Sequence, residues 1–195
     1  LYGKNIADNP DYGRIVNDRH YSRLADILEA DKEWIVYGGK HTKKGRFVGP
    51  AILDLGSVSG KAADQAVSMQ DELFGPVLPV LSYKKLQEAM DFVNKRERPL
   101  ALYIFTEDRD VRDRILEHTC SGGVCVNDTV DHLVNHRLPF GGVGNSGMGR
   151  YHGKYGFDTF THLRAVYEKP PGKSISPGYP PYSEAKLKLI KKFLR

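Results

Sequence analysis

A carboxylate and an aromatic ring stand two residues apart in the segment 69–76, which reads Met-Gln-Asp-Glu-Leu-Phe-Gly-Pro. A carboxylate such as Glu72 can accept hydrogen bonds from two neighbouring ribose hydroxyls, as acidic residues do in dinucleotide sites. An aromatic side chain such as Phe74 can pack on a planar ring. A surface glutamate beside a core phenylalanine has the same spacing, so the pair alone leaves both readings open.

Glycines are concentrated in the segment 138–149, where Gly142, Gly144 and Gly147 match the spacing G-x-G-x-x-G. That fingerprint binds a dinucleotide when it follows a strand and opens a helix. Here a Leu-Pro dipeptide precedes the glycines and no helical pattern follows, so we reject this reading. The glycines predict positive φ angles or close backbone approach, in a loop held against a ligand or a neighbouring subunit.

The histidines and cysteines are weak candidates for chemistry. His132 and His136 have the spacing of two metal ligands on a helix, but Leu133 replaces the glutamate that the metalloprotease pattern requires, so we expect no metal site. Cys125 lies in an apolar run that disfavours a thiolate. Cys120 follows the C-terminal end of a predicted helix, which also disfavours negative charge. We therefore expect neither cysteine to be catalytic.

Hydrophobic periodicity predicts the elements that position these residues. The stripe of Tyr21, Leu24, Ala25 and Leu28 indicates a helix over 18–30. The run 100–105 is continuous, as in a strand covered on both faces. We expect the segment 57–66 to be a surface loop. The other predicted strands are 34–37, 46–54, 77–82 and 122–126, and the other predicted helices are 86–93, 108–118, 156–162 and 182–195.

Strands and helices alternate from residue 77 to residue 126. This order favours an α/β fold, in which a parallel sheet carries helices on both faces. A Pro- and Gly-rich stretch follows at 170–181. We therefore divide the chain into a domain over 1–168 and a C-terminal extension over 169–195, consisting of the connector and a basic helix.

Composition narrows the class of protein. The 195 residues include 29 Lys and Arg and 24 Asp and Glu, for a net charge of +5. Because both signs are spread along the chain, we expect no nucleic-acid partner. Two cysteines form no disulfide framework, which favours a reducing, cytoplasmic compartment. No run is long and apolar enough to cross a bilayer. The start at Leu1 has the character of the middle of a longer chain.

Several motifs in sequence order together resemble the aldehyde dehydrogenase superfamily. The segment 69–76 is similar to its Glu-(Ile/Leu)-Phe-Gly-Pro motif, and Pro139–Gly142 is similar to its Pro-Phe-Gly-Gly motif. The class 3 branch of fatty and aromatic aldehyde dehydrogenases is similar in more places. These are 98–103, 121–124, Asn127-Asp128, His132, His136, 139–149, 151–154 and 158–160.

The resemblance implies that the chain is the C-terminal part of an incomplete catalytic domain. It assigns Glu72 to the nicotinamide ribose hydroxyls and Phe74 to the nicotinamide ring. It assigns Val130, Leu133, Val134 and Phe140 to the wall of the substrate tunnel. It implies NAD or NADP as cofactor, a medium- or long-chain or aromatic aldehyde as substrate, the remainder of the enzyme chain as partner, and a homodimer.

The resemblance also implies a covalent mechanism, in which a cysteine thiolate adds to the aldehyde carbon as a thiohemiacetal and hydride leaves for the cofactor. The nucleophile is expected upstream of Leu1, so we expect the chain alone to be inactive. The alternative is a non-catalytic fragment that acts as an oligomerisation or interaction module. The chain departs from the branch by a longer 57–66 segment and by Asp131, where an apolar residue is usual.

The basic C-terminal helix offers a second surface. Its lysines and arginine are expected to face anionic lipid while apolar side chains on its other side dip into the membrane surface. Docking of this helix on the protein is the alternative. The basic residues are Lys186, Lys188, Lys191, Lys192 and Arg195, and the apolar residues are Leu187, Ile190 and Leu194.

Overall fold

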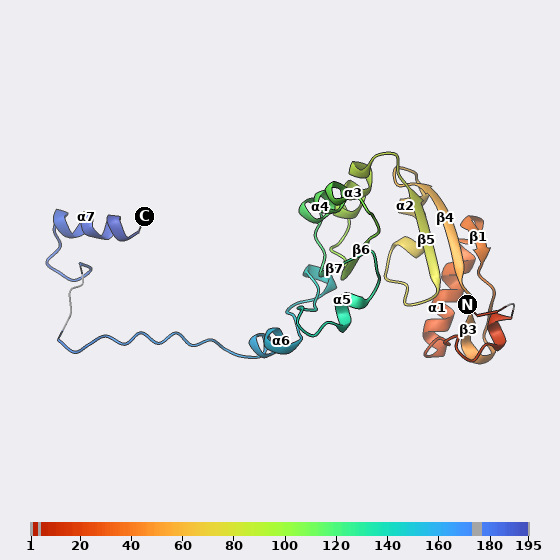
Figure 1. Cartoon of the computed structure of the whole chain (residues 1–195), viewed down its shortest axis with the longest axis horizontal. Helices are drawn as coiled ribbons and strands as arrows, with labels where there is room; N and C mark the ends of the chain where they lie inside the picture. The colour runs from red at the N-terminus through yellow and green to blue at the C-terminus, as the bar shows by residue number, and fades with distance from the viewer. Residues whose placement is uncertain (1, 4, 173–176, 195) are drawn as a thin grey trace. The chain divides into compact units, whose positions relative to one another are not determined.

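The computed structural model describes residues 2–3, 5–172 and 177–194. They belong to two compact units, Leu1–Thr159 and Phe160–Arg195, which we describe separately (Figure 1). The predicted boundary after residue 168 falls inside the second unit, in which residues 161–170 form neither helix nor strand.

Helix α1 (Asp18–Ala30) has the bounds that its periodicity predicts. The Asn17 side chain caps it by accepting a hydrogen bond from the His20 amide at 2.9 Å. Its buried face packs into the main hydrophobic core, which also includes the inward side chains of the first sheet. The buried residues of α1 are Tyr21, Leu24, Ile27 and Leu28.

The first sheet has the strand order β1-β4-β5. Strand β4 (Ala51–Ser57) pairs antiparallel with β1 (Ile35–Gly38) and parallel with β5 (Val77–Ser82). Alternate side chains of β4, at Ala51, Leu53 and Leu55, are buried, so one face of the sheet covers α1. A small antiparallel pair, β2 (His41–Thr42) and β3 (Phe47–Val48), lies beside it.

The prediction of a surface loop over 57–66 is wrong. Strand β4 extends to Ser57, and α2 (Ala62–Gln65) follows it. Ala63 and Ala66 are 1% and 0% exposed, so the segment packs into the core. Short 3₁₀ turns complete this part of the chain: η1 (Ile6–Asp8), η2 (Lys32–Trp34), η3 (Lys44–Arg46) and η4 (Val67–Met69).

The second sheet pairs β6 (Ala101–Ile104) with β7 (Gly123–Val126) in parallel, with Ala101 opposite Gly123. Helices α3 (Leu86–Asn94) and α4 (Arg109–His118) cover the face of β6 that carries Leu102 and Ile104. Short helix α5 (Asp131–Val134) follows β7 (Figure 1). His132 of α5 packs against Tyr103 on the opposite face of β6.

The α/β class and the parallel pairing are therefore confirmed. The described strands form two separate main sheets, and β5 and β6 are not hydrogen-bonded to each other. Tyr103 is 40% exposed, so β6 is also not covered on both faces as its apolar run suggested. Turn η5 (Gly144–Ser146) and helix α6 (Gly153–Thr159) close the first unit. The predicted helix over 156–162 is displaced toward the N-terminus, since α6 ends at Thr159. The Thr159 hydroxyl lies within hydrogen-bond distance of the Arg150 and Tyr155 carbonyls.

The second unit contains helix α7 (Glu184–Phe193), inside the predicted span 182–195. The Ser183 hydroxyl caps it by accepting a hydrogen bond from the Lys186 amide at 3.3 Å. Arg195, the last residue of the predicted helix, lies outside the described residues. Within the described part of the chain, no helix has the length and apolar character needed to traverse a bilayer.

Candidate functional site

A cavity of about 840 Å³ in the first unit brings several predicted site residues together. Glu72, Val130, Leu133 and Phe140 all line it, although nearly 70 residues separate the first from the last. Phe74 and Val134 are not in its lining and are 76% and 65% exposed. Four of the six residues assigned to cofactor and substrate thus share one space, and two lie outside its wall.

The cavity combines a polar and an apolar part. The backbone and side chains of 69–72 and 96–98 supply the polar part, and Glu72 belongs to it. Leu100, Ala101 and the tunnel residues from the α5 region and Phe140 supply the apolar part. A site of this kind can bind a hydroxylated group beside a hydrocarbon chain, since a few polar groups orient a ligand held mainly by apolar contact.

Helix α1 holds the backbone around Glu72. The Arg23 guanidinium donates hydrogen bonds to the carbonyl oxygens of Glu72, at 3.5 Å, and of Leu73. Gly75 lies against Leu24, and a Cβ added at Gly75 would be 2.6 Å from Leu24 Cδ1. The glycine of this motif permits close packing on α1, and a side chain there would force either Leu24 or the segment that carries Glu72 to shift.

Asp31, at the C-terminal end of α1, makes a second attachment. Its carboxylate is buried, and its two oxygens accept hydrogen bonds from the amides of Val67, at 2.9 Å, and Ser68, at 2.8 Å. These amides begin turn η4, which leads directly to Glu72. A buried carboxylate that is satisfied by two backbone donors is a strong anchor, because hydrogen bonds to a charged group are stronger than neutral ones.

Strained backbone conformations occur in the loops around the cavity. Phe74, Asn127, Val130 and His152 have φ angles of 50°, 58°, 68° and 90°. Val130 is the centre of a three-residue turn in which the Asp131 amide donates to the Thr129 carbonyl at 2.8 Å. Positive φ is costly for a β-branched residue, and such conformations are found mostly at functional sites.

Asn127 joins the ends of the two strands that lead into the cavity loops. Its side-chain oxygen accepts a hydrogen bond from the Thr106 amide at 2.8 Å, and its amide nitrogen donates to the Thr106 carbonyl at 2.9 Å. Thr106 follows β6, and Asn127 follows β7. The amide side chain thus continues the sheet pairing beyond the last strand residues and fixes the start of the loop that carries Val130.

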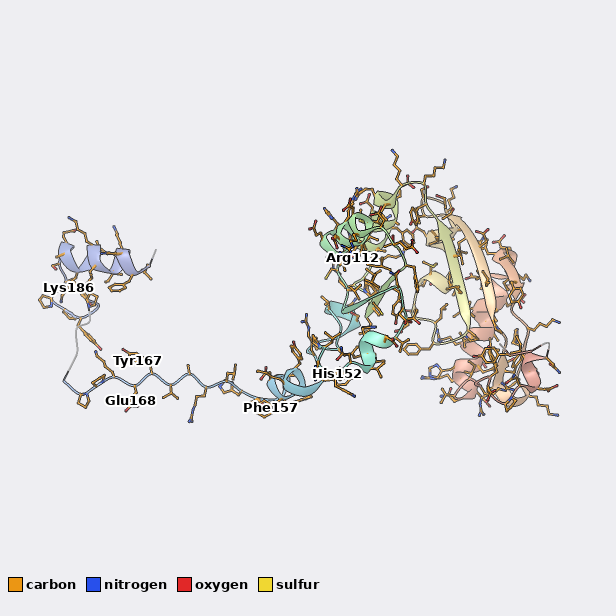
Figure 2. All side chains as sticks on the ribbon, in the orientation of Figure 1. Arg112, His152, Phe157, Tyr167, Glu168 and Lys186 are labelled. Atoms are coloured by element: carbon orange, nitrogen blue, oxygen red, sulfur yellow. The ribbon has the colours of Figure 1, made fainter. Side chains whose placement is uncertain are left out.

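Backbone hydrogen bonds and contacts between aromatic rings hold Phe140 in place. It forms an isolated antiparallel bridge with Tyr151, through hydrogen bonds of 3.0 and 2.9 Å. Its ring stacks on His152 with centroids 6.1 Å apart and packs against His132 at 6.0 Å. His152 is buried, and its Nδ1–H donates to the Leu138 carbonyl at 3.0 Å (Figure 2). His152 therefore positions Phe140 in the cavity wall, a role for which the sequence offered no specific signal.

The glycine-rich loop has the conformations expected of it. Gly144 has a φ of +63°, and a Cβ at Gly142 would be 2.1 Å from the Ser146 carbonyl carbon. The close approach is to the loop's own backbone, because the chain folds back in turn η5. Asn145 donates a hydrogen bond to the Glu97 carboxylate and so joins the loop to another part of the cavity wall. An isolated bridge at Phe140 precedes the loop, and the 3₁₀ turn η5 begins at Gly144.

The remaining candidates are dispersed. Helix α5 ends at Val134, so His132 and His136 do not share it; His132 packs on Phe140, and His136 packs on His152. The described residues contain no cluster of three side chains suited to a metal ion. Both cysteines are free thiols, with Cys120 exposed.

Comparison with known proteins places these features in a family. The model of the aldehyde dehydrogenase family matches residues 2–166. The chain is 46% identical to 4,4'-diaponeurosporen-aldehyde dehydrogenase of Staphylococcus aureus (strain NCTC 8325 / PS 47), covering 100% of this chain and 41% of that protein. It is also 46% identical to aldehyde dehydrogenase family 3 member A2 of Rattus norvegicus, covering 100% of this chain and 39% of that protein.

The fold is shared as well. The substrate-bound structure of Staphylococcus aureus AldH superposes with a TM-score of 0.81 at 45% identity, over 100% of this chain and 41% of that one. The chain spans about two fifths of the length of these relatives. With an α/β fold, a family match over most of its residues and class 3 relatives along its whole length, the chain belongs to the aldehyde dehydrogenase family.

Proposed function

We propose that the protein containing this chain oxidises medium- or long-chain or aromatic aldehydes to carboxylic acids with NAD or NADP. The observation that carries the proposal is the shared cavity of Glu72 and Phe140. It joins an acidic group suited to a ribose with an apolar wall suited to an aldehyde tail. The catalytic thiol would come from outside this chain, since the described chain supplies a binding wall and not a nucleophile aimed into that cavity.

The residues of the cavity fit a nicotinamide riboside. A bound nicotinamide would accept the hydride that leaves the substrate carbon. The Glu72 carboxylate would accept hydrogen bonds from the two ribose hydroxyls, while Arg23 holds the Glu72 backbone in place. Phe74 is exposed two residues further on, where its ring would cover one side of the nicotinamide. The choice between NAD and NADP depends on contacts away from this ring.

The apolar wall would select the aldehyde. Val130, Leu133 and Phe140 line the cavity, and each methylene of a substrate buried against them contributes about 0.8 kcal/mol. Val134 would extend the wall at its exposed end. The Staphylococcus aureus relative is named for the substrate 4,4'-diaponeurosporen-aldehyde, which supports a long rather than a short aldehyde here.

We also propose that the protein is a homodimer. In the second unit, the extended stretch 160–168 exposes Phe160, Leu163, Val166 and Tyr167 by 91%, 83%, 76% and 87% (Figure 2). Such a series of exposed apolar side chains is typical of a surface that is buried by a partner. A second copy of the protein is the partner that the family resemblance favours.

The Glu72→Gln variant of the full-length protein tests the cofactor role. Glutamine keeps the size of the side chain but loses the charge, and it keeps one oxygen to accept from two hydroxyls. We expect a KM for the cofactor raised at least severalfold and slower hydride transfer in a single turnover, because the nicotinamide would be less well oriented.

Glu117→Gln is the matched control, since Glu117 is exposed on α4 and lies outside the cavity lining. It should leave both constants unchanged. If Glu72→Gln behaved like this control, Glu72 would not bind the cofactor. If the unmodified full-length protein oxidised no aldehyde, the alternative of a non-catalytic interaction module would replace the enzyme.

A further inference from the structure

The cavity lies where two halves of the first unit meet. The first half is the first sheet with α1 and α2, and it carries Glu72; the second half is the second sheet with α3, α4 and α5, and the loop that follows it carries Phe140. Strands β5 and β6 are not hydrogen-bonded to each other. Pairing within the described sheets therefore does not fix the distance from the Glu72 carboxylate to the Phe140 ring.

Arg96 joins the two halves. It follows α3, which covers the second sheet, and its Nη2 donates to the Ala63 carbonyl at 2.9 Å and to the Asp64 carboxylate at 3.1 Å. Both acceptors belong to α2, in the first half, and α2 leads through η4 to Glu72. Arg96 thus connects α3 with the segment that approaches the predicted ribose-binding carboxylate.

The Arg96 guanidinium is held in a defined orientation. Its Cζ atom lies 3.6 Å from the centroid of the Phe92 ring, and its Nη1 donates to the Phe92 carbonyl at 3.5 Å. A planar guanidinium can stack on a ring while its N–H groups donate in several directions. A lysine ammonium cannot reproduce this combination, so the contact is specific for arginine.

Glu97 continues the connection toward the substrate wall. Its carboxylate accepts a hydrogen bond from the side-chain amide of Asn145. Asn145 lies in η5, inside the glycine-rich loop whose base is closed by the bridge between Phe140 and Tyr151. Arg96, Glu97 and Asn145 all line the cavity. Two consecutive residues therefore contact the cofactor side and the substrate side of the same space.

We propose that Arg96 and Glu97 are positioning residues that set how Glu72 faces Phe140, an inference that rests on the proposed function. Arg96 fixes α2 and with it the ribose-binding segment, while Glu97 fixes the glycine-rich loop and with it the aldehyde wall. Neither residue touches the reacting atoms. Hydride transfer requires the donor carbon and the acceptor ring at a defined distance, and a displacement of about 1 Å slows such a reaction about a hundredfold.

Affinity and rate should respond differently to loss of this connection. Glu72 stays attached to α1 through Arg23, and Phe140 stays paired with Tyr151, so each half of the site remains intact. A shift at the junction changes the distance between the two ligands but not the contacts of either one. The Kd values for cofactor and aldehyde should therefore change little, while the rate constant for hydride transfer falls.

The test measures single turnovers and equilibrium binding with the full-length protein. Arg96→Lys, Arg96→Met and Glu97→Ala should each lower the rate constant about ten- to a hundredfold, with both Kd values retained. The rate constant is decisive, because partial unfolding lowers only the amplitude. The double variant Arg96→Met/Glu97→Ala should be no slower than the slower single variant, because both contacts belong to one connection in series.

Hydrogen exchange gives a readout that needs neither cofactor nor substrate. In the ligand-free protein, Arg96→Met should speed amide exchange in α2, and Glu97→Ala should speed it in η5. Arg112→Lys, Arg112→Met and Glu117→Ala are matched controls. Arg112 pairs with its neighbour Asp113 on α4, and neither Arg112 nor Glu117 lines the cavity (Figure 2). The controls should retain the rate constant and the exchange of α2 and η5.

Four results would overturn the proposal: a retained rate constant in the Arg96 and Glu97 variants, a loss confined to the amplitude, losses that multiply in the double variant, or unchanged exchange in α2 and η5. Aldehyde oxidation by the unmodified protein is measured first. Its absence would overturn the proposed function and this inference together, whereas turnover with any of the four results would overturn this inference alone.

Discussion

Replacing Asp31 by Asn should destabilise the protein and loosen the segment that carries Glu72. The Asp31 side chain is 1% exposed, and its two oxygens accept from the Val67 and Ser68 amides at 2.9 and 2.8 Å. Asparagine keeps the shape of the side chain but has one acceptor oxygen. Its NH₂ group would face a backbone N–H, so one hydrogen bond is lost and a buried donor is left without a partner.

The size of the effect follows from these two contacts. A buried donor left without a hydrogen-bond partner costs about 1–3 kcal/mol. Because one backbone amide loses its partner, we expect Asp31→Asn to lower the free energy of unfolding by about 1–3 kcal/mol. Asp31→Ala, which leaves both amides unsatisfied, should lower it by about 2–6 kcal/mol. Since whole domains are stable by roughly 5–15 kcal/mol, the asparagine variant should still fold.

Urea denaturation and equilibrium cofactor binding measure the two consequences. The midpoint of unfolding should fall in Asp31→Asn, and the Kd for the cofactor should rise, because η4 leads from Asp31 to Glu72. Asp26→Asn is the control, since Asp26 is exposed on the same helix. If Asp31→Asn left both the urea midpoint and the cofactor Kd unchanged, Asp31 would not support the segment that carries Glu72.

Two further predictions concern an alkaline transition and assembly. Burial raises the pKa of Tyr12, whose hydroxyl donates a hydrogen bond to the Val48 carbonyl at 2.7 Å. The stability that Tyr12 contributes to the folded protein is therefore complete below the pKa of an unfolded tyrosine, about 10. It is lost as pH rises through the higher pKa of the folded state. Tyr12→Phe should cost about 1 kcal/mol at neutral pH, and the difference from the unmodified protein should shrink at alkaline pH in thermal unfolding; a constant difference would contradict this. Leu163→Asp should convert the proposed dimer to monomers in light scattering, because Leu163 is 83% exposed on the stretch 160–168; a dimer that persists in the variant would contradict the proposed interface.

Local periodicity predicted the elements whose apolar residues are large and regularly spaced. Helix α1 has the predicted bounds, and β6 and β7 lie where their apolar runs placed them. The segment 57–66 was misjudged because its buried residues, Ala63 and Ala66, are small and carry little hydrophobic signal. Their burial depends on packing against β4, which a local pattern does not contain.

Sheet membership could not be obtained from the order of elements. Alternating strands and helices correctly indicated parallel pairs, but they do not say which strand is the spatial neighbour of β5. Hydrogen bonding between strands is a long-range property, and β5 pairs with β4 while β6 pairs with β7. The division into two sheets therefore emerged only with the structure.

The sequence identified four of the side chains that line the cavity, but not the side chains that hold them in place. Arg23 and Asp31 have the appearance of solvated charges on an amphipathic helix, yet both bind backbone far along the chain. His152 carried a family resemblance without a role, and its contact with Phe140 depends on a bridge to Tyr151. Lys186, which was expected to face lipid, likewise donates hydrogen bonds to backbone, at the carbonyls of Tyr179 and Pro181.

A crystal structure of the full-length protein with its oxidised cofactor and an aldehyde tests the central claim most directly. The Glu72 carboxylate should lie within hydrogen-bond distance of both nicotinamide ribose hydroxyls, with the aldehyde tail against Phe140 in the same cavity. A nicotinamide ribose bound away from Glu72, or an aldehyde bound away from Phe140, would contradict it.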